Sequence, residues 1–141
     1  METGILSVLI KNCTLSGKVK ADYLVFETDE SYVPILYKMI PLDCLVVLDF
    51  FRDQLDRAGE VETIILKIQK FLETYTGKLI LNADDPNVSR LGKANPDNKN
   101  VYYFSVEKYK YATEELKEAG EGKFCPFCNT RLQYEYYQYA H

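Results

Sequence analysis

Apolar and polar positions along the chain alternate between the period of a strand and the period of a helix. Runs of apolar and β-branched residues predict four strands, at residues 21–30, 44–48, 78–81 and 101–104. Helical spacing and capping residues predict helices over residues 3–11, 31–38, 61–75 and 86–91. Because strands that alternate with helices pair in parallel through right-handed crossovers, the pattern predicts an α/β fold, a parallel sheet with helices on both faces.

Individual residues mark the expected ends of these helices. Ser31 is a suitable N-cap for the second helix, and Pro34 stands early enough in that helix to be tolerated. Pro86 suits the first position of the short helix that follows the third predicted strand. Gly77 is expected to end the long third helix.

Polar side chains gather at the carboxyl ends of three predicted strands. The three clusters are Glu27-Thr28-Asp29-Glu30, residues 49–57 and Asn82-Ala83-Asp84-Asp85-Pro86. In a parallel sheet these ends share one edge, and open α/β folds bind their ligands there. Carboxylates suit Mg²⁺, and an Asn followed by Asp residues could hydrogen-bond a purine edge and ribose hydroxyls. A solvated helix turn or a helix cap accounts for any one cluster, but the three together predict a nucleotide site.

Composition narrows the class of protein without identifying it. The 141 residues suit one ordinary domain, and the 47% of apolar and 27% of charged residues suit a globular chain with a core. The net charge of −4 and the lack of a Lys/Arg stripe argue against nucleic acid as a partner. No apolar run approaches the length of a membrane span and no signal peptide is evident, so a cytoplasmic location is expected.

The chain changes character after residue 107, where the α/β pattern of residues 1–107 gives way to a charged connection. Residues 108–141 also hold Cys125-Pro126-Phe127-Cys128 and a tyrosine-rich segment. Two cysteines at this spacing before a strand are typical of the first half of a four-cysteine zinc ribbon, which makes Cys125 and Cys128 candidate Zn²⁺ ligands. Without a second pair, a redox or inert pair is the alternative, and a terminal His141 is more often a surface residue than a third ligand.

Four tyrosines follow the cysteine pair, and they are Tyr134, Tyr136, Tyr137 and Tyr139. The faces of a half-exposed strand of the ribbon are the expected place for them. A platform on which bases stack is the alternative reading of the same residues.

Three ordered motifs resemble the central domain of the Mur ligase superfamily. They are Phe26-Glu27-Thr28-Asp29-Glu30, Phe51-Arg52-Asp53-Gln54-Leu55-Asp56-Arg57-Ala58-Gly59-Glu60 and Leu81-Asn82-Ala83-Asp84-Asp85-Pro86. The cysteine pair and the tyrosine-rich segment narrow the resemblance to the branch that amidates lipid II. Residues 1–107 are therefore expected to be part of an ATP-binding domain, and residues 108–141 to include the first half of an inserted zinc ribbon.

The resemblance implies a reaction, cofactors and a partner. In this branch ATP activates the α-carboxyl of the second-position D-glutamate of lipid II, a step of bacterial cell-wall synthesis at the membrane surface. A glutamine amidotransferase subunit of the GatD type then supplies the ammonia that forms the amide. The cofactors implied are ATP, Mg²⁺ and Zn²⁺.

The resemblance also implies roles for individual residues. Glu27 resembles the Mg²⁺-binding glutamate of the superfamily. Asn82 and Asp85 resemble the adenine- and ribose-side contacts to ATP, and Asp84 is their neighbour. Gln54 stands where many relatives have a metal-binding His, so it is the weaker candidate for Mg²⁺. No catalytic residue is assigned.

Parts that the superfamily needs are missing from the chain. The sequence holds no Gly-Lys-Thr or Gly-Lys-Ser phosphate loop, no second Cys-x-x-Cys and no C-terminal Mur domain. We therefore expect the chain to be an internal part of a longer subunit and to be inactive alone. Two alternatives remain open: a Mur or folylpolyglutamate-type ligase that adds an amino acid, and a non-catalytic zinc-ribbon module that binds partners.

Overall fold

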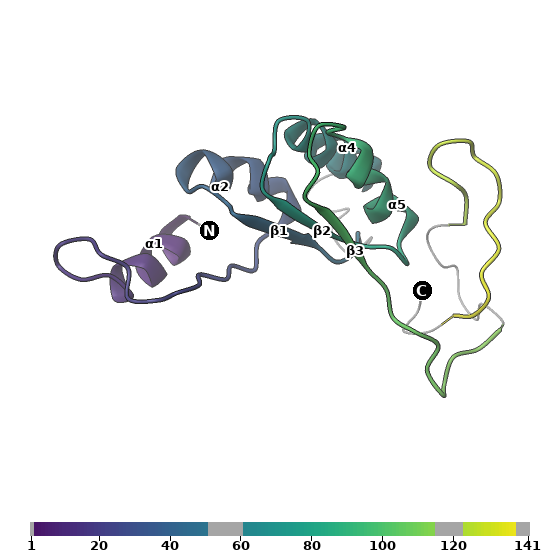
Figure 1. The fold of residues 1–141 in the computed structure, drawn as a ribbon, viewed down its shortest axis with the longest axis horizontal. Coiled ribbons are helices and arrows are strands. Elements are labelled where there is room, and N and C mark those ends of the chain that lie inside the picture. Colours follow the sequence, from purple (N-terminus) through teal and green to yellow (C-terminus); the bar gives the residue numbers. More distant parts are fainter. Residues whose placement is uncertain (1, 51–60, 115–122, 138–141) are drawn as a thin grey trace.

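The computed structural model describes residues 2–50, 61–114 and 123–137 (Figure 1). Within these residues a three-stranded sheet carries short helices. The helices and 3₁₀ turns are α1 (Glu2–Lys11), η1 (Glu30–Tyr32), α2 (Val33–Met39), α4 (Val61–Leu72), α5 (Pro86–Ser89) and η3 (Arg90–Lys93). The strands are β1 (Cys44–Val47), β2 (Lys78–Asn82) and β3 (Val101–Phe104).

The sheet is parallel throughout and has the strand order β1-β2-β3. Leu45 pairs with Leu79, and Leu79 pairs in turn with Val101. α4 lies in the chain between β1 and β2, and α5 lies between β2 and β3, as the alternating pattern predicts. The expected α/β fold with a parallel sheet is confirmed, and so are the expected strands at 44–48, 78–81 and 101–104.

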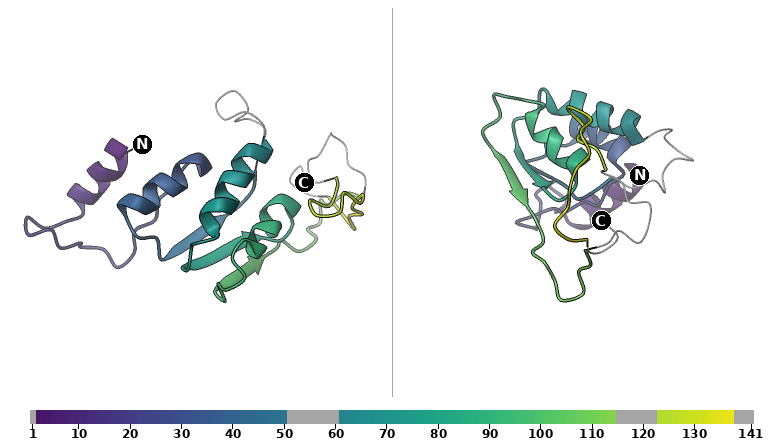
Figure 2. Two further views of the ribbon diagram at one scale, coloured as in Figure 1. Left: turned by 90° about the horizontal axis from the view of Figure 1, so that it is seen from above. Right: turned by 90° about the vertical axis from the view of Figure 1, so that its right-hand side faces the viewer.

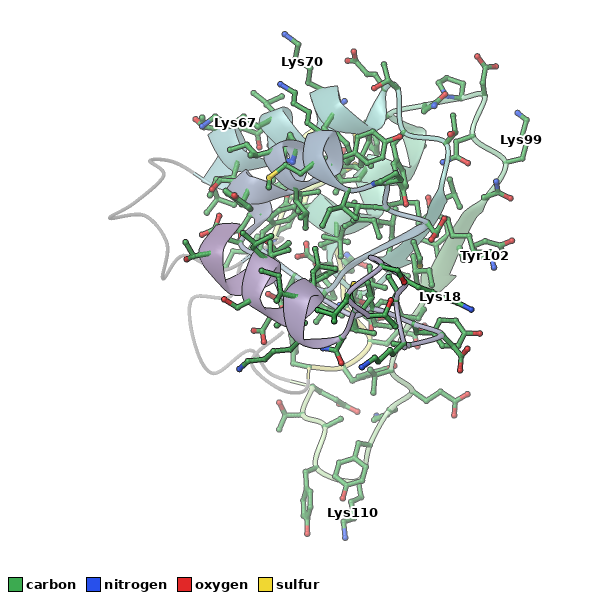
Figure 3. All side chains as sticks on the ribbon, turned by 90° about the vertical axis from the view of Figure 1, so that its left-hand side faces the viewer. Lys18, Lys67, Lys70, Lys99, Tyr102 and Lys110 are labelled. Carbon is green, nitrogen blue, oxygen red and sulfur yellow. The ribbon has the colours of Figure 1, made fainter. Side chains whose placement is uncertain are left out.

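The core lies between the sheet and the inner faces of the helices. The apolar face of α4 is buried as its periodicity predicts, through Ile64, Ile65, Ile68 and Leu72. Leu81 of β2 is fully buried against this layer. On the opposite side of α4, Lys67 and Lys70 project outward (Figure 3). The burial of one face and the exposure of the other place α4 as a cover over the sheet.

The described helices α2, α4 and α5 lie on the same side of the sheet (Figure 2). The sequence predicts helices on both faces of the sheet, and these three helices cover one face. On the other face Val46 is 49% exposed and Tyr102 is 51% exposed. Figure 3 shows Tyr102 projecting from β3 at the periphery of the molecule.

The strand expected at 21–30 is wrong, because these residues pair with no strand in the described part of the chain. Tyr23 is 88% exposed and Val25 is 92% exposed. Strand-forming side chains stabilise a strand by packing on a sheet, and these have no sheet to pack on. The expected cap is also wrong: the Asp29 carboxylate accepts the Ser31 N–H over 2.9 Å, so Asp29 and not Ser31 caps the turn η1 that precedes α2.

The chain after α4 turns around a buried tyrosine. Tyr75 is fully buried, and its hydroxyl oxygen lies 3.2 Å from both the Leu42 and the Lys78 carbonyl oxygens. Burial raises the pKa of Tyr75 far above its ordinary value, which keeps the hydroxyl a donor. α4 ends at Leu72, so Gly77 does not end the helix; its missing side chain makes room for the Tyr75 hydroxyl, which an added Cβ would overlap.

The described residues after β3 contain no named helix or strand. Isolated antiparallel bridges join Phe124 to Arg131 and Thr113 to Tyr137. The strand expected after the cysteine pair is therefore absent from residues 123–137. Across the three described ranges, no helix has the length and apolar character that crossing a membrane would require.

Candidate functional site

A cavity of about 600 Å³ lies at the carboxyl ends of the three strands. Its wall comes from the ends of β1, β2 and β3 and from one segment near the end of the described chain. The lining residues are Leu48, Asp49, Asn82, Ala83, Asp84, Asp85, Pro86, Phe104, Val106, Leu132, Gln133, Tyr134, Glu135 and Tyr136. A few polar groups in a largely apolar wall are typical of a small-molecule site, and this edge of a parallel sheet is its usual place.

Asn82 ties the end of β2 to the chain that leaves β1. Its side-chain Nδ2 donates to the Leu48 carbonyl oxygen over 2.9 Å. Its Oδ1 accepts the Asp84 N–H, also over 2.9 Å, and so shapes the turn after the strand. The two polar atoms of this amide therefore hold the floor of the cavity together.

Asp85 holds two further backbone groups. Its Oδ1 accepts the Asn87 N–H over 2.8 Å and caps α5, and Pro86 takes the first helical position as predicted. Its Oδ2 lies 3.4 Å from the Phe50 N–H, which is a weak contact to the chain after β1. Asp85 therefore fixes the start of α5 at the cavity.

Val106 connects the motif after β2 to the far wall of the cavity. The Asp84 Oδ2 accepts the Val106 N–H over 2.8 Å. The Tyr136 hydroxyl donates to the Val106 carbonyl oxygen over 3.0 Å. The N–H of Val106 is therefore bonded to Asp84 and its carbonyl oxygen to Tyr136. These two hydrogen bonds join the tyrosine-rich segment to the sheet edge.

The cavity brings together four of the polar residues singled out in the sequence: Asp49, Asn82, Asp84 and Asp85. Glu27 is exposed and does not line the cavity, because the strand that was expected to carry it to this edge is absent. Gln54 lies outside the described residues. The wall from Leu132 to Tyr136 was not predicted, although the run of tyrosines was the available signal.

Cys125 and Cys128 flank and end a tight turn of the chain. The Asn129 N–H donates to the Cys125 carbonyl oxygen over 2.9 Å, and Asn129 has a φ of 56°. Cys128 Sγ lies 3.3 Å from Thr130 Oγ1. Hydrogen bonds with the Thr130 side chain, then with its backbone, and then with the Cys125 side chain lower the pKa of the Cys128 thiol. A lowered thiol pKa favours the thiolate, which is the form that binds zinc.

The donor sets fit the implied metals only in part. In residues 2–50, 61–114 and 123–137, no three His, Cys, Asp or Glu side chains converge on one point. Cys125 and Cys128 fit half of a tetrahedral zinc site, which takes four ligands. For Mg²⁺, Asp49 and Asp84 offer carboxylate oxygens at the cavity, but Asp84 already accepts the Val106 N–H.

Removing the Thr130 hydroxyl should move the titration of Cys128 to higher pH. Thr130→Val keeps the shape of the side chain and removes the hydrogen bond that lowers the thiol pKa most. Less thiolate is then present at a given pH, so iodoacetamide should label Cys128 more slowly below the new midpoint. Peptide mass spectrometry after timed labelling across a pH series measures the midpoint. Thr76→Val, at an exposed position away from the turn, is the control; equal profiles for both variants would contradict the role of Thr130.

The fold and the cavity define a class of protein, a parallel α/β domain with a ligand cavity at the carboxyl edge of its sheet. No family model matches the chain. Over 139 residues it is 34% identical to the protein named lipid II isoglutaminyl synthase (glutamine-hydrolyzing) subunit MurT in Staphylococcus aureus strains COL and N315. It is 29% identical over 141 residues to the subunit of the same name in Streptococcus pneumoniae strain ATCC BAA-255 / R6.

These matches cover 99% of the chain, so the resemblance predicted from the motifs is confirmed. The chain is similar to MurT subunits along nearly its whole length. It spans 30% of the length of these curated relatives.

Proposed function

We infer that the chain forms part of a ligase that converts the α-carboxyl of the second-position D-glutamate of lipid II to an amide. The observation that carries this inference is the match to MurT subunits over 99% of the chain at 34% identity. The cavity at the sheet edge supports it, because Asn82, Asp84 and Asp85 of the motif after β2 line this cavity. The reaction would serve peptidoglycan synthesis in the bacterial cytoplasm, at the membrane surface where lipid II lies.

In the proposed reaction a carboxylate oxygen of lipid II attacks the γ-phosphorus of ATP, and ADP leaves. Ammonia then attacks the acyl carbon, and phosphate leaves as the amide forms. A GatD-type glutamine amidotransferase subunit would supply the ammonia. Asn82 and Asp85 would hold the adenine and ribose end of ATP, with Asp84 beside them, because all three line one cavity.

Metal ions would act at two places in the proposed enzyme. Mg²⁺ would neutralise the charge of the phosphates. Glu27, which lies outside the cavity, and, more weakly, Gln54 are the proposed ligands on the strength of the motif resemblance. Zn²⁺ would close the turn at Cys125 and Cys128 together with two further ligands. The backbone hydrogen bonds of the cysteine turn and the lowered pKa of Cys128 support this second site.

An exchange of homologous segments tests the proposed function. The matching part of the Staphylococcus aureus MurT subunit is replaced with the 139 aligned residues of this chain. With its partner subunit, glutamine, ATP and Mg²⁺, the exchanged subunit should convert lipid II to the amidated form, because the exchange keeps the cavity and the motifs. Mass spectrometry of lipid II, with a gain of one nitrogen-bearing amide, measures the product.

Two controls make the outcome clear. The unmodified Staphylococcus aureus subunit sets full activity, and the 141-residue chain alone should give none, because it holds no phosphate loop. An exchanged subunit that folds and binds its partner, but leaves lipid II unchanged, would contradict the proposed function. Circular dichroism and co-purification with the partner establish folding and assembly.

A further inference from the structure

The segment from Leu132 to Tyr136 forms the wall of the cavity that faces the sheet edge. Beside the polar Gln133 and Glu135, this wall contributes the rings of Tyr134 and Tyr136, and the sheet edge contributes the polar Asn82 and Asp85 among its lining residues. A cavity lined both by aromatic rings and by hydrogen-bonding groups suits a ligand that has both kinds of surface. A purine nucleoside has both, because its base is an aromatic plane and its ribose carries hydroxyls.

Hydrogen bonds hold this wall in place at two neighbouring positions. The Tyr136 hydroxyl donates to the Val106 carbonyl oxygen over 3.0 Å. The Tyr137 N–H donates to the Thr113 carbonyl oxygen over 2.7 Å, and the Thr113 N–H donates to the Tyr137 carbonyl oxygen over 2.9 Å. The wall is therefore fixed to the chain that leaves β3.

A contact between Lys93 and Phe127 also holds the cysteine turn against the helical turn η3. The Lys93 Nζ lies 4.3 Å from the centre of the Phe127 ring, close enough for a cation–π contact with the turn after α5. The Leu132 N–H donates to the Lys123 carbonyl oxygen over 2.9 Å, and this closes the loop that carries the cysteines. The loop thus brings the tyrosines to the cavity from a distant part of the sequence.

The two tyrosines of the wall differ in what surrounds them. The hydroxyl of Tyr136 is already bonded to Val106, and the Lys108 Nζ lies 5.9 Å from the centre of the Tyr136 ring. Tyr134 is half-buried, and the centre of the Tyr137 ring lies 5.5 Å from the centre of the Tyr134 ring. Burial raises the pKa of Tyr134, and the nearby charge of Asp85 raises it further. Tyr134 also shares the cavity with Asp85, the aspartate proposed to hold a ribose.

We propose that Tyr134 is the base-stacking residue of this cavity, and that its ring supports the purine of a nucleoside whose ribose hydroxyls face Asp85. The Tyr137 ring packs against the Tyr134 ring, and the Tyr136 hydroxyl anchors the segment through Val106. This assignment rests on the proposed function, because it names the residue that recognises the base of its nucleotide. It also gives the tyrosine-rich segment a role in ligand recognition.

Fluorescence of 2-aminopurine riboside tests the assignment without any catalytic readout, because stacking on an aromatic ring quenches this probe. The full 141-residue chain should quench the probe saturably. Tyr134→Ala should weaken this binding by about tenfold, since stacking on one aromatic ring contributes on the order of 1–3 kcal/mol per base. Tyr134→Phe keeps the ring and should bind within about twofold of the unaltered chain, as stacking rather than the hydroxyl holds the base.

A third variant separates stacking from packing. Tyr134→Leu fills the space with an apolar side chain but has no ring, so it should lose quenching as Tyr134→Ala does. Tyr102→Ala, at a position that is 51% exposed on β3 outside the cavity, is the matched control and should quench like the unaltered chain. Undiminished quenching by both ring-less variants, or no saturable quenching by the unaltered chain, would overturn the assignment.

Different experimental results would refute the stacking role of Tyr134 and the proposed ligase function. If the exchanged subunit amidates lipid II while Tyr134→Ala still quenches the probe fully, only the stacking role of Tyr134 is refuted. If the chain quenches the probe as expected while the exchanged subunit leaves lipid II unchanged, only the ligase function is refuted.

Discussion

Replacing Asp85 with alanine in the exchanged subunit should raise the KM for ATP between about tenfold and a hundredfold. The proposed contact is a hydrogen bond from a ribose hydroxyl to a charged acceptor, which is worth about 1.5–3 kcal/mol. The same change removes the N-cap of α5, because the Asp85 Oδ1 accepts the Asn87 N–H over 2.8 Å. Loss of such a cap costs about 1 kcal/mol of unfolding free energy. Steady-state amidation at varied ATP, together with urea unfolding, measures both effects.

Asp85→Asn separates the two roles of this residue. Asparagine caps helices about as well as aspartate, so the unfolding free energy should stay within about 0.5 kcal/mol of the unaltered protein. It has one oxygen in place of two and carries no charge, so the KM for ATP should still rise. A normal KM in Asp85→Asn would show that Asp85 is only a structural residue of the sheet edge.

Leu72→Ala should lower the unfolding free energy by about 2–5 kcal/mol. Leu72 is 1% exposed, at the end of α4, and lies within the core formed with the sheet. Its removal takes apolar area out of the core and leaves a cavity there. For a domain of this size, such a loss is a large part of the total stability.

Leu66→Ala is the matched control for this prediction. Leu66 is on the same helix and has the same chemistry, but it is 55% exposed. Its replacement should change the unfolding free energy by less than about 1 kcal/mol, because little area is returned to water and no cavity forms. Urea unfolding followed by circular dichroism measures both variants. Equal losses for Leu66→Ala and Leu72→Ala would show that α4 does not cover the sheet as described.

The elements predicted correctly are those whose periodicity reflects burial on a neighbour. α4 buries the face that its apolar spacing marks, and β2 buries Leu79 and Leu81 on its inner side. The segment 21–30 has strand-forming residues but no partner strand in the described chain, and composition cannot reveal whether a partner exists. Gly77 failed as a helix end because its role comes from a distant contact with Tyr75 that local sequence does not encode.

The sequence predicts those residues of the candidate site that come directly after a strand. Asn82 and Asp85 reach the cavity because β2 carries them to the carboxyl edge, as in other parallel sheets. Glu27 does not line it, because the strand that should have delivered it is absent. The wall from Leu132 to Tyr136 could not be predicted from the sequence. Its position depends on how a segment distant in the sequence folds back onto Val106.

The hydrogen bonds that Asn82, Asp84 and Asp85 make to backbone groups also have a thermodynamic consequence for binding. Ordering a free side chain around a ligand costs about 0.5–1.5 kcal/mol of conformational entropy. These three side chains are ordered by the fold itself, so that cost is met when the chain folds rather than when the ligand arrives. A nucleoside should therefore bind in this cavity with a smaller entropic penalty than in an equally polar site whose side chains become ordered only on binding.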